Sequence, residues 1–352
     1  MPKKVTFRDV ANAAGVSLAT VSRVAGGIVP VSPEVEARVR SSALQLGLNL
    51  SEQSNMKIAG FLFGNRPLLR PFHSLVLQAA ERYFAAHEYN LMFLSFDYDD
   101  KVNLQDLHMP AVLQRRGLVC GYILAARVYP NLLEFFRLRG IPSAVIGNHV
   151  MGEWQDDQCD VVWLDDIQGA YEGTRFLQSL GHRDIWFIGA RRPTGGPRRY
   201  EGYRRAMVEA GLSPHNSEIN SNDYFELGYL STKSLLNRGE PLTAILAASD
   251  IVAQGVYRAL SDCGLHVPDD VSVVGFDDIE APFMHPPLTT VRVFADEIGR
   301  ELAEMLLNRI TRPDLAPQRN VIPTRMVKRE SHRSLSSKLE YENEAREQHL
   351  RP

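Results

Sequence analysis

The sequence predicts a small all-α head followed by a larger α/β body of two lobes, each built on a doubly wound parallel sheet. Two short helix patterns flank a glycine within residues 6–24. From residue 58 onward, short apolar runs alternate with amphipathic stretches, which is typical of β-α-β units. The chain has 352 residues, and at about 150 residues per domain this length leaves room for about two lobes besides the head.

The head is predicted to contain a helix-turn-helix. Thr6 is placed to cap the first helix, with Asp9 three residues on as in a capping box. Gly15 supplies the backbone freedom that a tight turn needs, and Ser17 is placed to cap the second helix. The apolar positions of both helices fall on faces that pack together, namely Val10, Ala11, Ala14, Val21 and Val24.

A third helix is indicated by Ser32 as its cap, Pro33 at its first position and Gly47 at its end. Its apolar stripe consists of Val35, Val39 and Leu46. Three such helices make a minimal head. The alternative is a helical hairpin that covers the core of the next domain; the small-residue turn and the polar outer face together favour the head.

The outer face of the second helix carries small, hydroxylated and basic side chains, namely Leu18, Ala19, Thr20, Ser22 and Arg23. Serine and threonine reach phosphate oxygens, and arginine bonds guanine edges. Residues 1–50 hold six Lys and Arg against three Asp and Glu, a formal charge of +3, which leaves −6 for the rest of a chain whose total is −3. This asymmetry suits a head that approaches double-stranded DNA.

Residues 5–48 resemble the head of the lac-repressor and galactose-repressor family of bacterial transcription regulators. The run Val-Ser-x-x-Thr-Val-Ser-Arg-Val at 16–24 is nearly the signature of that family. The resemblance implies that the second helix enters the major groove, with Leu18, Ala19 and Arg23 facing the bases. It also implies that four hydroxylated residues contact or orient toward the DNA backbone, namely Thr6, Ser17, Thr20 and Ser22.

The composition is that of a soluble globular protein, with 44% apolar and 23% charged residues. Neither a signal-peptide core nor a long uncharged apolar run is present, so we expect a cytoplasmic, nucleoid-associated protein that does not contact membranes. Cys120, Cys159 and Cys263 are far apart and lack paired spacing, so we expect neither a disulfide framework nor a metal site. We also expect no cofactor.

Two series of strands and helices make up the predicted body. The first lobe has strands at 58–63, 91–96, 118–124 and 143–146 and helices near 72–87, 103–116 and 130–139. The second has strands at 161–164, 185–188, 244–248 and 271–276 and helices near 166–180, 198–211, 226–238 and 250–262. A crossover at 288–293, a helix near 294–310 and a last strand near 320–327 follow. We assign 1–49 to the head, 50–57 to a linker, 58–160 with 291–320 to the first lobe, and 161–290 with 321–331 to the second.

The body resembles the two-lobed, periplasmic-binding-protein-like sensor domain of the same family, whose chain passes between the lobes three times. The resemblance predicts that a small-molecule effector, a sugar or sugar derivative, binds between the lobes, where the carboxyl ends of parallel strands converge. It extends to Ser331. Residues 332–352 are expected to form a polar, frayed tail.

Two polar sites at predicted strand ends match effector-binding positions of the family. Asp277 and Asp278 follow the strand at 271–276, and Arg199 opens the helix after the strand at 185–188. A helix cap for the aspartates and a surface ion pair for the arginine are the alternatives. We expect Asp277 and Arg199 to contact the effector and Asp278 to have a structural role.

Four further residues are candidates for effector contact, namely Phe72, His73, Asn148 and Tyr224. Each has an alternative role: Phe72 is as compatible with the core as with the cleft. His73 is also compatible with a structural role, and Asn148 with a turn. Tyr224 and its neighbour Phe225 offer a surface on which an effector could stack, and the sequence leaves open whether they serve this role.

Other positions lower the expected polarity of the first lobe. Ala125, Gly147 and Val293 stand where relatives often carry polar residues.

Asp250 follows the strand at 244–248 and is expected to cap the next helix.

The linker at 50–57 departs from the family pattern. Relatives carry a segment resembling Pro-Asn-x-x-Ala-Arg-x-Leu, which wedges a leucine into the minor groove. The proline, the alanine-arginine pair and the leucine of that pattern are missing here. We expect DNA binding and leave DNA kinking open.

These features predict a ligand-responsive transcription regulator, in its simplest form a repressor. A homodimer would read a pseudo-palindromic operator, and the effector would shift the lobes. A ligand-binding module that has lost specific DNA binding is one alternative, and an enzyme on the same lobes is another. Against the enzyme, the sequence has no Walker lysine loop, nucleophile elbow or His-Glu-x-x-His motif, so we expect no catalytic residues.

Overall fold

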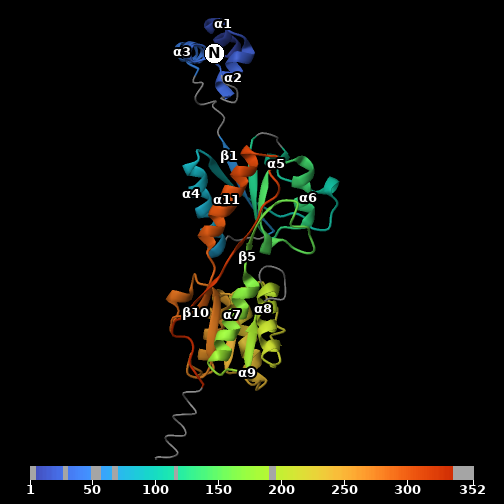
Figure 1. The fold of residues 1–352 in the computed structure, drawn as a ribbon, viewed down its shortest axis with the longest axis vertical. Helices are drawn as coiled ribbons and strands as arrows, with labels where there is room; N and C mark the ends of the chain where they lie inside the picture. The colour runs from blue at the N-terminus through green and yellow to red at the C-terminus, as the bar shows by residue number, and fades with distance from the viewer. Residues whose placement is uncertain are drawn as a thin grey trace, which may run out of the picture. The chain divides into compact units, whose positions relative to one another are not determined.

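The computed structural model describes residues 5–26, 31–48, 57–65, 70–114, 118–189 and 196–335 (Figure 1). They form two compact units, a head and a body. The predicted linker at 50–57 lies outside the described residues except for Lys57. Among the described residues, no helix combines the length and the apolar character that crossing a membrane requires.

The head consists of short helices with local caps. Its described helices are α1 (Phe7–Ala14), α2 (Leu18–Gly26) and α3 (Pro33–Gln45). The predicted capping box is confirmed, because Thr6 N donates to Asp9 Oδ2 at 2.8 Å and Asp9 N donates to Thr6 Oγ1 at 3.4 Å. The hydroxyls of Ser17 and Ser32 each accept a hydrogen bond from the backbone N–H three residues on, at 3.1 and 3.4 Å, which confirms the other two caps.

A small apolar core holds the three helices together. Val10, Val21 and Val39 are fully buried in it. The expectation that Leu46 continues the buried stripe of α3 is wrong, since Leu46 is 37% exposed. Leu46 is the C-cap of α3; Ala43 is fully buried in the core, and Leu48 packs against it from beyond the helix end.

Lobe 1 is a six-stranded sheet in the order β11-β5-β4-β3-β1-β2 among the described residues. Its strands are β1 (Ile58–Gly64), β2 (Asn90–Phe96), β3 (Gly121–Ala126), β4 (Ser143–Ile146), β5 (Asp160–Leu164) and β11 (Arg319–Ile322). Its helices are α4 (Pro71–Ala86), α5 (Ala111–Gln114), α6 (Pro130–Arg139) and α11 (Ala295–Thr311), with 3₁₀ turns at Leu104–Asp106 and Gly147–His149. Helices α4 and α11 pack side by side (Figure 1). The helix expected near 103–116 is interrupted, because the described residues of this range, 103–114, form the first 3₁₀ turn and the short α5 with non-helical residues between them.

Lobe 2 is a six-stranded sheet in the order β12-β10-β9-β8-β6-β7 among the described residues, in which β12 runs antiparallel to β10 and the other paired strands are parallel. Its strands are β6 (Ile185–Ile188), β7 (His215–Asn216), β8 (Ala244–Ala247), β9 (Ser272–Asp277), β10 (Thr289–Arg292) and β12 (Arg325–Val327). Its helices are α7 (Asp166–Ser179), α8 (Gly196–Glu209), α9 (Tyr224–Asn237) and α10 (Asp250–Ser261), with a 3₁₀ turn at Ala281–Phe283. Helices α7 and α8 approach so closely that a Cβ on Gly202 would lie 2.0 Å from Ile167 O, which explains the glycine.

The chain passes between the lobes three times, as predicted. The passages run from Leu164 to Asp166, from Arg292 to Ala295 and from Ile322 to Arg325. The predicted last strand near 320–327 is therefore two strands, β11 in lobe 1 and β12 in lobe 2.

The predicted boundary between the lobes is wrong at three points. The strand at 161–164 was expected in the second lobe, but β5 pairs with β4 and β11 in lobe 1. Residues 291–292 belong to lobe 2 and residues 321–322 to lobe 1. The connection from β4 to β5 contains a 3₁₀ turn in place of the α-helix that β-α-β units have. The sequence therefore shows a break before β5, although the boundary between the lobes lies after it.

The described tail begins later than expected. Residues 332–335 pack on lobe 2, where Leu335 N donates to Leu180 O at 2.9 Å and Arg333 N donates to Ser272 Oγ at 3.1 Å. Residues 336–352 lie outside the described residues. Lobe 1 is therefore 58–164 with 295–322, and lobe 2 is 166–292 with 325–335.

Candidate functional site

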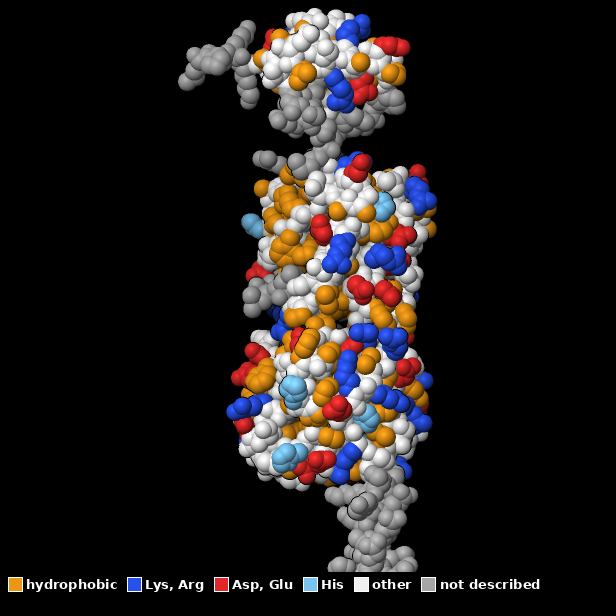
Figure 2. All heavy atoms as spheres, turned by 90° about the vertical axis from the view of Figure 1, so that its left-hand side faces the viewer, with side chains coloured by type: hydrophobic (Ala, Val, Ile, Leu, Met, Phe, Trp, Pro, Cys, Tyr) orange, Lys and Arg blue, Asp and Glu red, His pale blue; other side chains and the backbone are white. Residues whose placement is uncertain are grey.

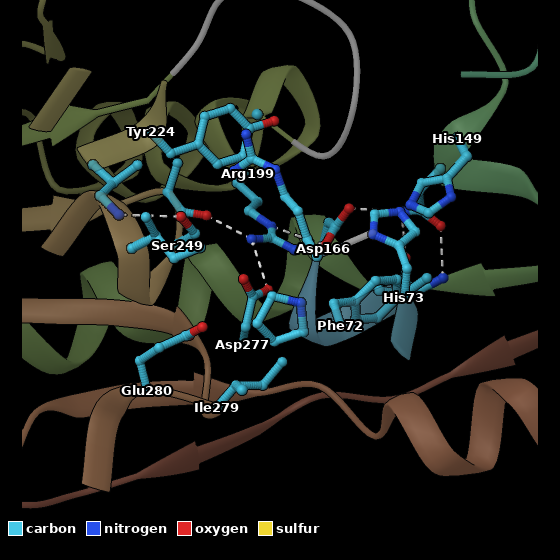
Figure 3. Close-up of a pocket in the computed structure, with 18 of the residues that line it drawn as sticks. Phe72, His73, His149, Asp166, Arg199, Tyr224, Ser249, Asp277, Ile279 and Glu280 are labelled. Atoms are coloured by element: carbon cyan, nitrogen blue, oxygen red, sulfur yellow. Dashed lines mark hydrogen bonds and ion pairs between the residues drawn. The ribbon is translucent and has the colours of Figure 1, made fainter. Parts of the chain in front are cut away.

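A cavity of about 90 Å³ lies between the two lobes (Figure 3). The residues expected to contact an effector all line it: Phe72, His73 and Asn148 from lobe 1, and Arg199, Tyr224 and Asp277 from lobe 2. They meet there because they follow the carboxyl ends of parallel strands, where loops and helix N-termini converge. Contact of these six residues with an effector stays a prediction.

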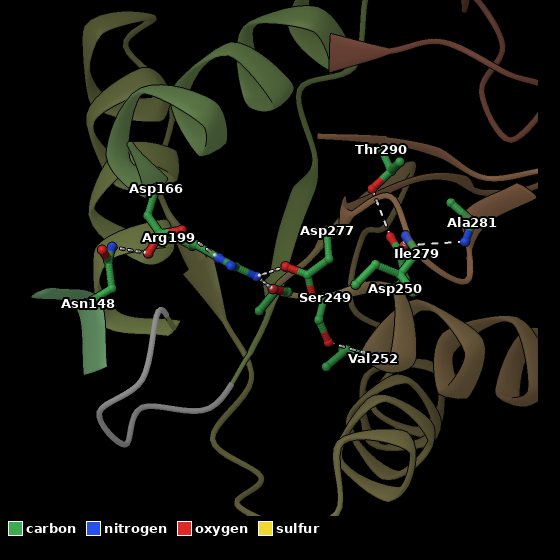
Figure 4. A network of polar contacts seen from close by, with 11 residues as sticks. Asn148, Asp166, Arg199, Ser249, Asp250, Val252, Asp277, Ile279, Ala281 and Thr290 are labelled. Atoms are coloured by element: carbon green, nitrogen blue, oxygen red, sulfur yellow. Dashed lines mark hydrogen bonds and ion pairs between the residues drawn. The ribbon is translucent and has the colours of Figure 1, made fainter. Parts of the chain in front are cut away.

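Arg199 is the centre of the polar wall of the cavity (Figure 4). Its Nε donates to Asp166 Oδ1 at 3.1 Å, and its Nη1 lies 3.0 Å from Asp277 Oδ1 and donates to Ala248 O at 2.5 Å. The guanidinium carbon also lies 3.8 Å from the centroid of the Phe276 ring. Arg199 is only 9% exposed, so the alternative of a surface ion pair is wrong.

The backbone at Asp277 and Asp278 separates the two carboxylates. Both residues have a positive φ, 111° and 61°, which side-chain-bearing residues rarely adopt and which costs about 1–3 kcal/mol each. Asp277 thereby lines the cavity, whereas Asp278 turns away and forms ion pairs with Arg329 at 2.6 Å and Arg292 at 2.8 Å. These ion pairs confirm the expected structural role of Asp278.

The Asp277 carboxylate is held in an unfavourable environment for its charge. Burial raises its pKa to about 6; Arg199 lowers the pKa and the neighbouring Asp166 raises it. A hydroxyl donor from a ligand would stabilise the ionised form of this carboxylate.

Asn148 joins the end of lobe 1 to the start of α7. Its Nδ2 donates to Asp166 Oδ2 at 2.6 Å and to Leu164 O at 3.0 Å, and its Oδ1 accepts from Leu164 N at 2.7 Å. The amide thus holds Asp166, which in turn holds Arg199. This support of the polar wall is more than the turn role considered from the sequence.

The lobe 1 wall is aromatic. The Phe72 and His73 rings lie 5.3 Å apart between centroids, and His149 lies 5.8 Å from Phe72 and 5.1 Å from His73. His149 Nδ1 accepts from Ala126 N at 3.3 Å. Phe72 lines the cavity and is partly exposed, which decides against a pure core role.

The expectation that Asp250 caps α10 is wrong, because Ser249 is the cap. The Asp250 carboxylate instead accepts three hydrogen bonds, from Ile279 N at 2.8 Å, Ala281 N at 3.2 Å and Thr290 Oγ1 at 2.8 Å (Figure 4). Burial, and the negative charge of Asp277, raise the pKa of Asp250 to about 7. Asp250 therefore fastens the loop that follows Asp277.

Four residues that sequence reasoning missed also line the cavity, namely Arg70, His149, Asp166 and Glu280. Asp166 follows a strand as Asp277 does, so the same pattern was available to indicate it. Arg70 and Glu280 sit in loops beyond their strands, and no local signal marks them. In the described part of the chain, no group of three or more His, Cys, Asp or Glu is placed to hold a metal ion.

The outer face of α2 is accessible for contact with DNA. Thr6, Ser17, Leu18, Ala19, Ser22 and Arg23 are exposed, and Thr20 is partly exposed. Leu18 is 47% exposed. The hydroxyls of Ser17 and Thr20 lie 2.8 Å apart at the helix start, where backbone N–H groups bind phosphate. Their roles on DNA stay predictions.

Comparisons with known proteins agree with both units. Residues 6–47 match the model of the bacterial regulatory proteins of the lacI family, and residues 174–332 match a periplasmic binding protein-like domain. The chain is 32% identical to the ribose operon repressor of Escherichia coli over 331 residues, which cover 89% of this chain and 96% of that protein. The chain belongs to the lacI family.

Two further matches extend over most of this lacI-family chain. The repressor PurR of Pectobacterium atrosepticum is 31% identical over 319 residues, 87% of this chain and 90% of that protein. A solved lacI-family regulator from Enterococcus faecium with bound ribose has a TM-score of 0.67 and 27% identity, and covers 79% of this chain and all of that one. This lacI-family protein is a DNA-binding transcriptional regulator with a small-molecule effector site.

Proposed function

We propose that this lacI-family regulator is a cytoplasmic, nucleoid-associated repressor that binds a neutral sugar between its lobes and reads a pseudo-palindromic operator as a homodimer. The Arg199–Asp277 ion pair on the cavity wall, 3.0 Å between Nη1 and Oδ1, carries the sugar proposal. An arginine donor beside a carboxylate acceptor matches the alternating donor and acceptor character of adjacent sugar hydroxyls. The aromatic wall of Phe72 supplies a surface for the C–H face of the sugar ring.

The charges of the cavity favour an uncharged ligand. Arg70 and Arg199 face Asp166, Asp277 and Glu280, so the ionised wall carries one negative charge more than positive ones. Arg199 is already held by two carboxylates. A sugar phosphate would add negative charge next to them, which disfavours it relative to the parent sugar. The ribose named for two of the relatives makes D-ribose the first sugar to test.

The homodimer proposal is supported by apolar side chains on lobe 1. Leu75 on α4 is 40% exposed and Phe93 on β2 is 43% exposed. Figure 2 shows hydrophobic side chains gathered on the face of the molecule that lies at the left of Figure 1, where α4 is seen. Exposed apolar patches of this kind mark protein contacts.

A ligand screen tests the effector. Thermal unfolding of the full chain is measured with D-ribose, other neutral sugars, D-ribose 5-phosphate and hypoxanthine, because a bound ligand stabilises the folded form by mass action. We expect a neutral sugar to raise the unfolding temperature, and Asp277→Asn to remove that shift. Glu201→Gln, in an exposed ion pair on the same lobe, is the control that keeps it. Stabilisation by hypoxanthine alone, or a sugar shift that survives Asp277→Asn, contradicts the proposal.

Operator selection tests the head. We expect random DNA to be enriched for a palindrome, and Arg23→Ala to weaken binding to the selected site by about 5- to 150-fold, since a bidentate arginine contributes about 1–3 kcal/mol. Arg40→Ala is the control, because Arg40 is an exposed head arginine already paired with Glu36. Absence of any enriched sequence would favour a ligand-binding module without specific DNA binding.

A further inference from the structure

Arg70, which lines the cavity, links the two lobes through its side chain. It lies at the start of α4 in lobe 1, and its guanidinium carbon is 3.8 Å from the centroid of the Tyr224 ring in lobe 2. Its Nη2 donates to Asn222 O, also in lobe 2, at 3.3 Å. Burial raises the pKa of Glu280 in lobe 2, and the charge of Arg70 acts against that rise. One side chain of lobe 1 thus interacts with three residues of lobe 2.

The strand order places this contact far from the passages between the lobes. Arg70 follows β1, which lies beside the edge strand β2 of lobe 1, and Tyr224 follows β7, the edge strand of lobe 2. The three passages leave from β5, β11, β10 and β12, at the opposite ends of the two sheets. A rotation of the lobes about these passages therefore moves Arg70 and Tyr224 apart by more than residues near the passages.

A second contact of the same chemistry provides a comparison. The Arg198 guanidinium of lobe 2 lies 4.8 Å from the centroid of the Trp163 ring in lobe 1. Trp163 is in β5, directly before the first passage. The same rotation changes this distance little, because the contact is close to the pivot.

The position of the Arg70 contact gives it a consequence for binding. Arg70, Tyr224 and Glu280 all line the cavity in which the effector is proposed to bind. A change in the distance between the lobes at this contact therefore changes the cavity itself.

We propose that Arg70, stacked on Tyr224 and bonded to Asn222 O, is a clasp that holds the cleft closed before the effector enters. The clasp rests on the proposed function, in which the cleft is the effector site. A cation–π contact of this kind shifts the ratio of closed to open protein by about 5- to 30-fold. The effector then has to displace the clasp or keep it while the lobes adjust around the sugar, so its affinity depends on the clasp.

The test measures the distance between the lobes without effector or DNA. Spin labels are attached at Leu138→Cys on α6 and Val208→Cys on α8, which are 62% and 54% exposed, in the full chain with its three cysteines replaced by serine. Double electron–electron resonance is recorded after dilution with unlabelled protein. Arg70→Gln and Tyr224→Leu remove the clasp, Tyr224→Phe keeps the ring, and Arg198→Gln removes the contact near the pivot.

We expect Arg70→Gln and Tyr224→Leu to increase the fraction of protein in a wider distance population at least fivefold. Tyr224→Phe and Arg198→Gln leave the distribution as in the unmodified labelled chain. An unchanged distribution in both clasp variants, or equal widening in Arg198→Gln, overturns the proposal. If Arg70→Gln fails to fold, Tyr224→Leu and Arg70→Lys decide the question, the latter with an intermediate distribution because lysine keeps the charge and loses the planar face. Since no sugar is present, the result stands apart from the ligand screen.

Discussion

The two walls of the cavity differ in how their side chains are held. On lobe 2, Arg199 and Asp166 are tied to each other and to their neighbours by hydrogen bonds and ion pairs of 2.5–3.1 Å. On lobe 1, Asn148 is the donor of one of these hydrogen bonds, whereas Phe72 and His73 make ring contacts with centroids 5.0–5.8 Å apart. The difference shows that the ion-paired side chains of the cavity belong to lobe 2, whereas the aromatic side chains Phe72 and His73 belong to lobe 1.

The largest expected effect comes from removing the cation of the lobe 2 wall. Arg199→Leu leaves Asp166 and Asp277 buried without their counter-charge, so we expect the body to lose about 3–5 kcal/mol of unfolding free energy. Arg204→Leu, an exposed arginine on the same helix, should change it by less than about 0.5 kcal/mol. Urea unfolding of the body measures both. Equal effects of the two variants would mean that the ion pairs of Arg199 do not stabilise the lobe 2 wall.

The second prediction concerns the pH dependence that lobe 2 builds into the body. The folded pKa of Asp250, about 7, lies above the ordinary aspartate value. The folded state therefore keeps this proton more tightly than the unfolded state, and the contribution of Asp250 to stability falls as pH rises from about 4 to about 7. We expect the stability of Asp250→Asn relative to the wild type to rise by about 2 kcal/mol from pH 5 to pH 7, because about 1.4 kcal/mol accompanies each pH unit over which only the folded state holds the proton.

Urea unfolding at several pH values measures this difference. Asp262→Asn, on the exposed end of the same helix region, serves as the matched control. A stability difference between Asp250→Asn and wild type that stays constant with pH would remove Asp250 from the explanation.

A smaller effect is expected from the hydrogen-bonding residue of the lobe 1 wall. Asn148→Ala leaves Leu164 N and one Asp166 oxygen without their partner, which costs about 1–3 kcal/mol. Because Asp166 supports Arg199, we also expect weaker sugar binding by isothermal calorimetry. Unchanged binding would mean that Arg199 is held without help from lobe 1, which sharpens the contrast between the walls.

The smallest stability effect is expected on the aromatic wall. Phe72→Leu keeps the apolar character of a partly exposed residue, so the unfolding free energy should change by less than about 1 kcal/mol. Loss of the flat ring should weaken sugar binding about tenfold by the same calorimetry, which corresponds to about 1.4 kcal/mol. A loss of unfolding free energy as large as that of Arg199→Leu would show that both walls contribute equally to the stability of the body.

Local features could be predicted from the sequence because their causes lie within a few residues. The Thr6–Asp9 capping box and the caps at Ser17 and Ser32 depend on contacts three residues apart. The exposure of Leu46 could not be predicted in this way, because it depends on which side chains at the end of α3 meet the other two helices. The strand at 161–164 was placed in the wrong lobe for a related reason: strand pairing is a contact between distant segments, and apolar runs look alike in either sheet.

By itself, the sequence determined the helical head, the β-α-β rhythm of the body and the strand-end positions of Arg199 and Asp277, because caps, periodicity and turn residues act locally. Only the tertiary structure decided that Arg199 is shared between Asp166 and Asp277, that Asp250 fastens a loop instead of capping a helix, and that Arg70 reaches Tyr224. These contacts join segments that meet only once the strands have been ordered in two sheets. Burial then strengthens the contacts between charged groups, because the attraction between charges increases when water is removed from around them.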